Sequence, residues 1–459
     1  MAGMSSAINA AIAVTRFGLG AKPGEIADAS TDPRGWLLGQ IHREGASQPL
    51  TLGGLPFPDS QTRFTDFITY RAAIKEAGDD EMKRKAAREA LRLPTAAEML
   101  CRTQLATATG QPFTERWTLF WSNHFTVSVN KSQELAALAP TFEREAIRPH
   151  VFGRFEDLLV ASSRHPAMLM YLDQAQSIGP NSRAGLRKVG GLNENLAREI
   201  MELHTLGADA GYTQGDVTEF ARALTGWSVG RPNQAAEYEG AYLYRPNVHE
   251  PGSRQIFGRR YGDGEEDQAR RVLADLAASP KTADHLARKI AIHFVSDQPD
   301  PALVSRLSEA YRRSNGDLAR VAEALITAPE AWREDAAKIK TPYELLVSGY
   351  RAVGQQPRDF AREVNNPLSV MGQRPLSAPQ PNGWSESGAE WAAPDALIKR
   401  LQWAQGFANV YTPQDDPAAL AASALGARLG PATLTAIQRA ESRKEALAIL
   451  IMSPEFQRR

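Results

Sequence analysis

The sequence predicts a mainly α-helical fold, a multi-helical globular body with one small β-hairpin region. Through most of the chain, apolar residues recur at the three- to four-residue spacing of amphipathic helices. The alternation of polar and apolar residues that is typical of strands is confined to residues 229–262. A chain of 459 residues is also too long for one simple core. We therefore expect an N-terminal helical domain (1–228), a β-hairpin insertion (229–262) and a C-terminal helical domain (263–459) packed on the first.

The predicted helices begin and end at recognisable residues. Asp32-Pro33 has the pattern of a helix start, and Thr213 followed by Asp216 has that of a capping box. Between helices, residues 179–191 (GPNSRAGLRKVGG) are rich in glycine and basic residues, which is typical of a surface loop. The segments with helical character are residues 5–45, 59–109, 113–131, 134–148, 154–173, 193–207, 209–227, 264–356 and 394–459.

Composition excludes several classes of protein. The 53 basic and 53 acidic residues cancel, which argues against nucleic acid as the main partner. The single cysteine, Cys101, cannot form an internal disulfide. No apolar run approaches the roughly 20 residues that span a bilayer, and the N-terminus lacks the basic region and cleavage site of a signal peptide. We expect a cytoplasmic protein without a membrane span, with a periplasmic location open if it is exported with a partner.

The first candidate site lies in the aromatic stretch 113–131 (FTERWTLFWSNHFTVSVNK). Trp117, Trp121 and His124 recur there at helical spacing, so the helix is expected to be buried. A lone histidine among aromatic residues is most often a hydrogen-bonded core residue, and a ligand or proton-transfer role is the alternative. Asn123 can orient or polarise a substrate oxygen. Asn123 and His124 are therefore candidate catalytic residues.

The second candidate site is the predicted helix 193–207 (NENLAREIMELHTLG), the segment of the chain richest in groups that bind metals or move protons. Asn195, Glu199 and Glu202 follow at i, i+4 and i+7 and form a polar stripe with Arg198. Such a stripe suits a hard metal ion or paired acid–base carboxylates. Glu199 and Glu202 are predicted catalytic residues and metal ligands, and Asn195 and Arg198 are predicted to bind substrate.

A structural interpretation of the same helix competes with that prediction. Glu194, Arg198 and Glu202 are spaced as an i, i+4 ladder of ion pairs, and no known metal motif is matched. Spacing alone favours the ladder. His204, however, projects with the apolar residues towards the core, where an exposed ladder has no use for it. This favours a functional site or a buried polar network, and His204 joins the candidate catalytic residues.

Two further segments contribute candidates. EYEGAYLYRPN is predicted to pair with RQIFGRRYG, and this hairpin would bring His249 near the cleft as a metal ligand with Glu199 and Glu202. A hydrogen-bonded histidine in a turn is the alternative for His249. Trp384 and Trp391, in the Pro/Gly-rich loop 378–391, could stack on a sugar or an aromatic ligand, with simple packing as the alternative.

The amphipathic stretch 281–294 (KTADHLARKIAIHF) offers two more histidines. His285 is expected to be exposed and His293 to lie in the core, so neither is a strong candidate.

Several motifs, in order, are similar to those of a known family. Residues 193–227 resemble the signature of the bacterial domain-of-unknown-function 1800 family, and the resemblance covers most of the chain. One departure is His249-Glu250, where relatives usually show His-Asp, so Glu250 is given little weight. The other matching motifs are RFGLGAKPGE, FWSNHFTVS, HPAMLMYLD, KTADHLARKIAIHFV, KTPYELLVSGYRAVG and PQPNGW.

The resemblance implies a helical body but no settled biochemical activity. It also implies a partner, because genes of this family often lie beside those of a second family that looks like alkaline phosphatases and sulfatases and often carries an export signal. Two functions therefore stay open. One is an acid–base or metal-assisted enzyme, a hydrolase or lyase on a glycan or ester, with a divalent metal as the candidate cofactor. The other is a non-catalytic assembly or maturation partner of the phosphatase-like protein.

Overall fold

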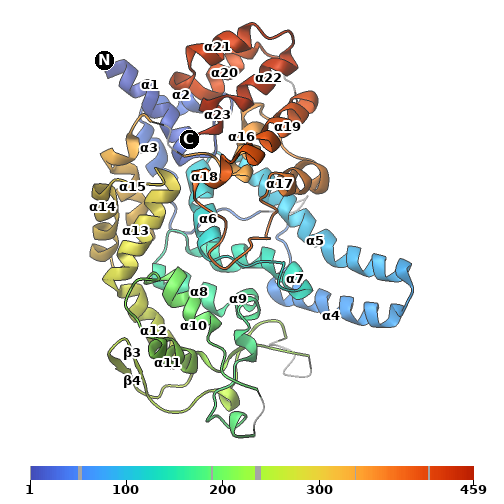
Figure 1. The fold of residues 1–459 in the computed structure, drawn as a ribbon, viewed down its shortest axis with the longest axis vertical. Helices are drawn as coiled ribbons and strands as arrows, with labels where there is room; N and C mark the ends of the chain where they lie inside the picture. Colours follow the sequence, from blue (N-terminus) through green and yellow to red (C-terminus); the bar gives the residue numbers. More distant parts are fainter. Residues whose placement is uncertain (1, 50–53, 188–189, 233–238, 336–337, 412–413) are drawn as a thin grey trace.

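The structure is a computed structural model that describes residues 2–49, 54–187, 190–232, 239–335, 338–411 and 414–459. Helices dominate these residues, and their strands form two antiparallel two-stranded sheets, which confirms the predicted mainly α fold. Figure 1 shows an elongated molecule with the C-terminal helices at one end and the strands at the other. None of the described helices combines the length and the apolar character needed to cross a membrane.

The first part of the chain builds the middle of the molecule and a projecting helical hairpin. The hairpin consists of α4 and α5, which begin after the capping side chains of Asp59 and Asp80 and reach away from the body (Figure 1). The elements are α1 (Ala2–Ile12), η1 (Ala13–Phe17), α2 (Glu25–Ser30), α3 (Pro33–Leu38), α4 (Ser60–Ala77), α5 (Glu81–Ala108), α6 (Pro112–His124), α7 (Gln133–Phe142), η2 (Glu143–Ile147), η3 (Arg148–His150), α8 (Phe155–Arg164) and α9 (Pro166–Tyr171).

The middle of the chain holds the short strands. The capping box predicted at Thr213 and Asp216 is confirmed: each side chain accepts a hydrogen bond from the other residue's backbone amide at the start of α11. The elements are η4 (Gln174–Gln176), η5 (Gly185–Arg187), α10 (Asn195–Glu199), η6 (Ile200–His204), α11 (Gln214–Leu224), β1 (Trp227–Val229), β2 (Tyr242–Tyr244), η8 (Pro246–Val248), β3 (Arg254–Ile256) and β4 (Arg259–Tyr261).

The predicted pairing of the strands is wrong. β2 pairs with β1, not with the later RQIFGRRYG segment, and β3 pairs with β4 inside that segment. The reason is the two-residue turn Phe257-Gly258, in which both residues have positive φ (52° and 75°). Such a turn joins adjacent antiparallel strands directly.

The last part of the chain is helical and returns to the N-terminal helices (Figure 1). The elements are α12 (Glu266–Ala278), α13 (Pro280–Phe294), α14 (Pro301–Arg313), α15 (Leu318–Thr327), η9 (Pro329–Trp332), α16 (Pro342–Ala352), η10 (Phe360–Asn365), α17 (Asn366–Val370), α18 (Gly388–Trp391), α19 (Pro394–Tyr411), α20 (Pro417–Leu425), η11 (Gly426–Arg428), α21 (Pro431–Gln438), α22 (Arg443–Met452) and α23 (Pro454–Gln457).

The larger hydrophobic core surrounds α6. Trp117 and Trp121 are fully buried, and their rings meet edge to face with centroids 5.9 Å apart. Phe294, at the end of α13, lies 5.9 Å from the Trp117 ring. The aromatic stretch is therefore a buried helix, as predicted, and it fixes α13 beside α6.

A second core joins the two ends of the chain. Leu19 packs in it with residues of α16, α19, α20 and α22. Arg351 of α16 donates to the carbonyl of Gly20. It also donates to both carboxylate oxygens of Glu25, at 2.7 and 2.8 Å. The division of the chain into residues 1–228, 229–262 and 263–459 stays a prediction.

Candidate functional site

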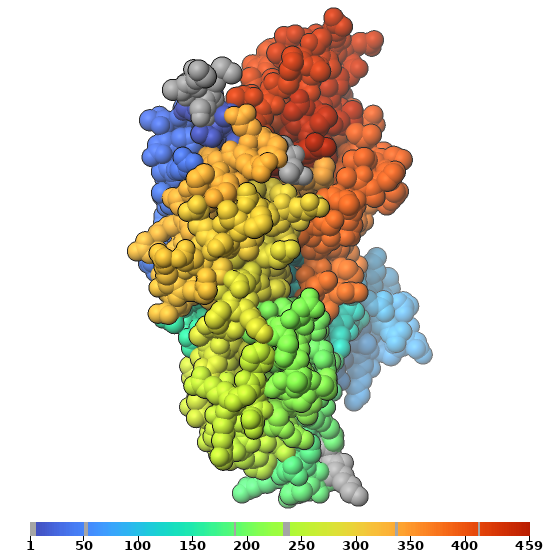
Figure 2. All heavy atoms as spheres, turned by 60° about the vertical axis from the view of Figure 1, so that its left-hand side comes forward, coloured from blue at the N-terminus to red at the C-terminus, as the bar shows by residue number. Residues whose placement is uncertain are grey.

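Three polar residues of α13 lie on one face of that helix. His285, Lys289 and His293 follow one another at four-residue intervals, and this spacing places side chains above one another on a helix. The face meets the end of α6 and residues 378–391, which we name the Trp384 loop. Figure 2 shows the yellow segment that contains α13 against the orange segment that contains this loop.

Asn123, at the end of α6, anchors the Trp384 loop. Its Nδ2 donates to the carbonyl of Trp384 (2.9 Å), and its Oδ1 accepts from the amide of Trp384 (2.7 Å). Trp391 Nε1 donates to the carbonyl of Ser385 (2.8 Å), and the rings of Trp384 and Trp391 lie 6.4 Å apart. The structure thus brings together Asn123, Trp384 and Trp391, three residues that the sequence singled out separately.

The buried His293 pairs with the half-buried Glu386 between α13 and the loop. His293 Nδ1 lies 2.8 Å from Glu386 Oε1, and Nε2 of the same ring is buried without a hydrogen-bond partner among the described residues. Lys338 donates to the carbonyl of Glu386. Burial alone would raise the pKa of the Glu386 carboxyl, but the contact with His293 and the charges of Lys338 and Arg116 lower it to about 2. Glu386 is therefore ionised at neutral pH.

An inner cavity of about 150 Å³ lies beside this pair. Part of its lining is apolar, and part consists of polar side chains from α6, η2, α13, α16 and the Trp384 loop. The apolar residues include Met99, Leu119, Val127, Val364, Leu368 and Leu376. The polar residues include Asn123, Glu143, His293, Tyr343, Glu344 and Glu386.

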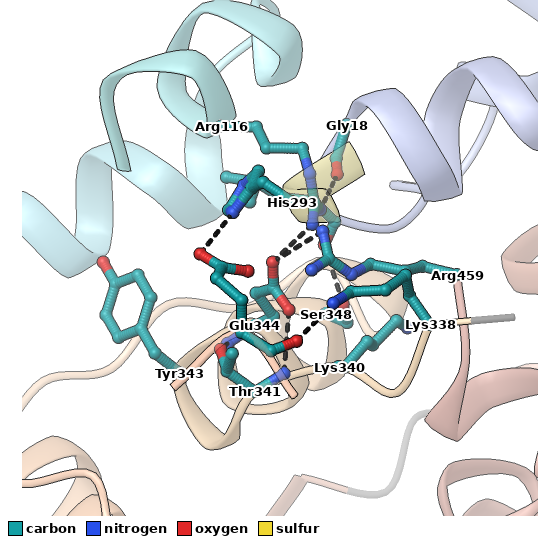
Figure 3. Close-up of polar contacts among 12 residues, drawn as sticks. Gly18, Arg116, His293, Lys338, Lys340, Thr341, Tyr343, Glu344, Ser348 and Arg459 are labelled. Carbon is teal, nitrogen blue, oxygen red and sulfur yellow. Dashed lines mark hydrogen bonds and ion pairs between the residues drawn. The ribbon is translucent and has the colours of Figure 1, made fainter. Parts of the chain in front are cut away.

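Glu344 joins α6, α16 and the C-terminus in one network. Figure 3 shows Arg116 and Arg459 converging on its carboxylate, with His293 and Tyr343 close by. The ion pair with Arg459 spans 3.1 Å, and Glu344 also completes a capping box with Thr341 at the start of α16. The Glu344 side chain is 5% exposed and the two arginine side chains are each 1% exposed, so this network is buried.

An outer cavity of about 390 Å³ adjoins the inner one. The two share four lining residues, Asn123, Trp384, Ser385 and Glu386. Lys289 and His124 line the outer cavity, as do Phe120, Gln380 and Glu390. The candidate site is thus a pair of cavities on the two sides of the Asn123–Trp384 contact.

His124 belongs to a cluster of neutral imidazoles next to the outer cavity. Its Nε2 donates to the carbonyl of His204 (3.1 Å), and its ring centroid lies 5.9 Å from that of His204 and 6.5 Å from that of His285. Burial and the positive charge of Lys289 lower the pKa of His124 well below 6.5, that of His204 to about 3 and that of His285 to about 4. The cluster brings together His124 and His204, both predicted site residues.

Segment 193–207 consists of α10 and the π-helical turn η6. Arg198 pairs with Glu194 (3.2 Å) and with Gln214 (2.8 Å), so the described contacts form only the first half of the expected ladder. Burial and the charge of Glu202 raise the pKa of Glu199. Asn195 is exposed at the start of α10. The structure ties this segment to the cavities through the His204 carbonyl and places its carboxylates outside their lining.

The predicted metal set of Glu199, Glu202 and His249 is not supported. Among the described residues, no group of three or more histidine, cysteine, aspartate or glutamate side chains could hold a metal ion. His249 follows η8 and is held there, because its Nδ1 lies 2.7 Å from the carbonyl of Thr225 at the end of α11. Glu250 accepts from the backbone and the side chain of Asn181.

Three residues of the cavities were missed or set aside in the sequence: Lys289, His293 and Glu386. The sequence contains a signal for Lys289 and His293, because together with His285 they follow at four-residue intervals and so share one face of a helix. The buried position predicted for His293 is confirmed, with an exposed fraction of 5%. The exposure predicted for His285 is wrong, because its ring is half-buried against the carbonyl of Leu203 (3.1 Å).

These features define a helical protein with a polar, partly enclosed site between α6, α13, α16 and the Trp384 loop. The chain belongs to the family described as protein of unknown function, DUF1800, whose family model matches residues 12–458. No curated protein and no solved structure matches the chain.

Proposed function

We propose that this protein is an enzyme that hydrolyses a small ester in the inner cavity, with His293 as the general base. One observation carries the proposal: Glu386 fixes one nitrogen of the buried His293 ring, and the other nitrogen has no partner among the described residues. In this tautomer Nδ1 donates to Glu386, and Nε2 keeps a lone pair that can accept a proton.

The other charged groups of the cavity support this assignment of roles. Glu143 pairs with Arg102 (2.6 Å), and Glu344 pairs with Arg116 and Arg459. Burial would raise the pKa of Glu143, but Arg102 and Arg148 lower it to about 2. Carboxylates held by guanidinium groups are weak bases. His293 instead presents a ring nitrogen, Nε2, that has no hydrogen-bond partner among the described residues and is placed to accept a proton.

The lining favours an ester over a glycan. Aliphatic side chains from α5, α6, η10 and α17 suit an apolar acyl group, whereas a sugar needs many hydrogen-bond partners.

In the proposed reaction His293 takes a proton from water, and the water oxygen attacks the carbonyl carbon of the ester. The carbon–oxygen bond to the leaving group then breaks, and the leaving oxygen receives the proton from His293. The products are a carboxylic acid and an alcohol, without a metal or a covalent intermediate.

Hydrolysis of p-nitrophenyl esters with short and medium acyl chains tests this function. We expect release of p-nitrophenolate above the rate in buffer, with a preference for one range of chain length set by the cavity. A protein that hydrolyses none of these esters faster than buffer does would contradict the proposal.

A second candidate function is that of a partner protein, as the family resemblance implies. One observation favours it: α19 exposes Leu397 (39%), Ile398 (55%) and Leu401 (40%) within two turns. The partner would be the phosphatase- or sulfatase-like protein encoded nearby. Co-purification of the two proteins, lost on Leu401→Asp but kept on Val370→Asp, is the expected result. Failure of the unaltered pair to associate would remove this candidate.

A further inference from the structure

We propose that Lys289 is a reactive amine that forms an imine with a small aldehyde or ketone in the outer cavity. No feature of ester hydrolysis at His293 requires this reaction, so the inference is independent of the function proposed above. It rests on the surroundings of the Lys289 side chain, on the cavity that this side chain lines and on a comparison with two lysines that are fully buried, Lys338 and Lys340.

The first observation is that the Lys289 amine is unpaired. It lies half-buried in the middle of α13, yet it makes no hydrogen bond or ion pair within the described part of the chain. Lys338, which is 1% exposed, has Asp297 at 2.5 Å and the carbonyl of Glu386 as partners. Lys289 is less deeply buried and has no such partner among the described residues, so its amine is free to react in the outer cavity.

The second observation is the chemistry of the groups that face Lys289. His285 and His293 flank it on α13, His124 faces it from α6, and His204 faces it from η6. The carboxylate of Glu386, in the Trp384 loop, attracts the Lys289 ammonium. These neighbours do not compensate the charge, so burial lowers the pKa of Lys289 from 10.5 to about 8. The neutral, nucleophilic amine is then on the order of 100-fold more populated at neutral pH than in an ordinary lysine.

The third observation is the cavity itself. Lys289 lines a space of about 390 Å³, which admits a small carbonyl compound. The side-chain amide of Gln380 and the carboxylate of Glu390 line the same space. They offer a hydrogen-bond donor for the carbonyl oxygen and a group that can relay protons.

The reaction balances without a further reagent. The Lys289 nitrogen attacks the carbonyl carbon, a carbon–nitrogen bond forms, and the carbonyl oxygen becomes a hydroxyl. That hydroxyl leaves as water with the second amine proton, and a carbon–nitrogen double bond remains. One water molecule is released for each imine formed.

Lys340 is a control for the effect of a lowered pKa, because its amine has a lowered pKa but lies beside neither cavity. It is 3% exposed, its ammonium lies 4.1 Å from the centroid of the Phe456 ring, and burial lowers its pKa to about 7. It lines neither cavity. If a lowered pKa were sufficient, Lys340 would react as fast as Lys289. Because imine formation also needs space for the carbonyl compound beside the amine, we expect only Lys289 of the two to react.

Reductive alkylation of the intact protein tests the inference. The folded protein is treated at neutral pH with limiting propionaldehyde and sodium cyanoborohydride, and propylation of each lysine is followed by peptide mass spectrometry. We expect Lys289 to react at least about 10-fold faster than the exposed Lys444, and Lys340 to stay unmodified. Lys289→Arg should remove the fast reaction, and Lys444→Arg should leave it unchanged. Equal rates at Lys289 and Lys444, or at Lys289 and Lys340, would overturn the inference.

Discussion

His293 Nδ1 lies 2.8 Å from Glu386 Oε1, and this contact joins α13 to a loop 93 residues further along the chain. The pair closes the inner cavity on one side and adjoins the outer cavity through Glu386. Because Glu386 is the hydrogen-bond partner of one imidazole nitrogen, it sets the tautomer of His293. The proposed chemistry depends on that tautomer.

Replacing Glu386 by glutamine should slow ester hydrolysis. Without the carboxylate, the favoured tautomer and the stabilisation of protonated His293 are both weakened, so kcat should fall roughly 100-fold while KM changes little. Steady-state kinetics on the best p-nitrophenyl ester measure both constants. Glu390→Gln, in the same loop but lining only the outer cavity, should keep the kcat of the unaltered protein. Equal losses in both variants would argue against the positioning role of Glu386.

His204 and His285 should make the fold sensitive to mild acid. The pKa of His204 is lowered to about 3 and that of His285 to about 4, so the unfolded chain binds more protons below pH 6.5. Their contribution to stability is complete above that pH and is lost as the pH falls towards the folded values. Denaturant unfolding between pH 7 and pH 4.5 should show the free energy of unfolding falling by up to about 1.4 kcal/mol per pH unit for each histidine.

The variant His285→Gln tests whether His285 contributes to this acid sensitivity. It removes one of these groups, so its free energy of unfolding should depend less steeply on pH than that of the unaltered protein. Parallel pH profiles for the two proteins would show that His285 does not contribute.

Neutralising Glu344 should destabilise the protein strongly. Arg116 and Arg459 would be left as buried, uncompensated charges, at a cost of about 3–5 kcal/mol. Glu344→Gln keeps the shape of the side chain and isolates the effect of charge, which chemical denaturation can measure. The matched change in the exposed pair of Arg320 and Glu323, Glu323→Gln, should leave the free energy of unfolding nearly unchanged. Similar costs for the two variants would contradict a buried network.

Removing the Asn123 side chain should loosen the Trp384 loop. Asn123→Ala breaks both hydrogen bonds to Trp384, each worth on the order of 1 kcal/mol. Hydrogen–deuterium exchange should therefore quicken roughly 10-fold or more across residues 380–387. Asn382→Ala, in the loop itself, should leave exchange near the rate of the unaltered protein. Unchanged exchange in Asn123→Ala would mean that other contacts hold the loop.

Local sequence patterns predicted the fold class and part of the site. The aromatic spacing around Trp117 identified a buried helix, and the same helix presents Asn123 and His124 to the cavities. His204 was placed on the apolar side of its helix by its angular position alone, and it is buried. These predictions succeeded because each depends on residues within a few turns of one another.

The rest of the site depends on contacts between distant segments. The contact between Glu386 and His293 could not be predicted from local sequence. Glu386 lies in an irregular loop, which has no helical or strand periodicity to show the direction of its side chains. The predicted metal set finds no support for the same reason: His249 lies against the carbonyl of Thr225, a contact across 24 residues of chain. The strand pairing failed because two positive-φ residues, Phe257 and Gly258, close a hairpin inside one segment.

The most direct test of the proposed site compares His293→Gln with His150→Gln. His150 is a half-buried histidine on η3, outside both cavities, so its replacement controls for the loss of an imidazole. We expect kcat/KM for the best p-nitrophenyl ester to fall at least about 100-fold in His293→Gln and to stay within about twofold of the unaltered protein in His150→Gln. Full hydrolytic activity in a folded His293→Gln variant would contradict the assignment of His293 as the general base.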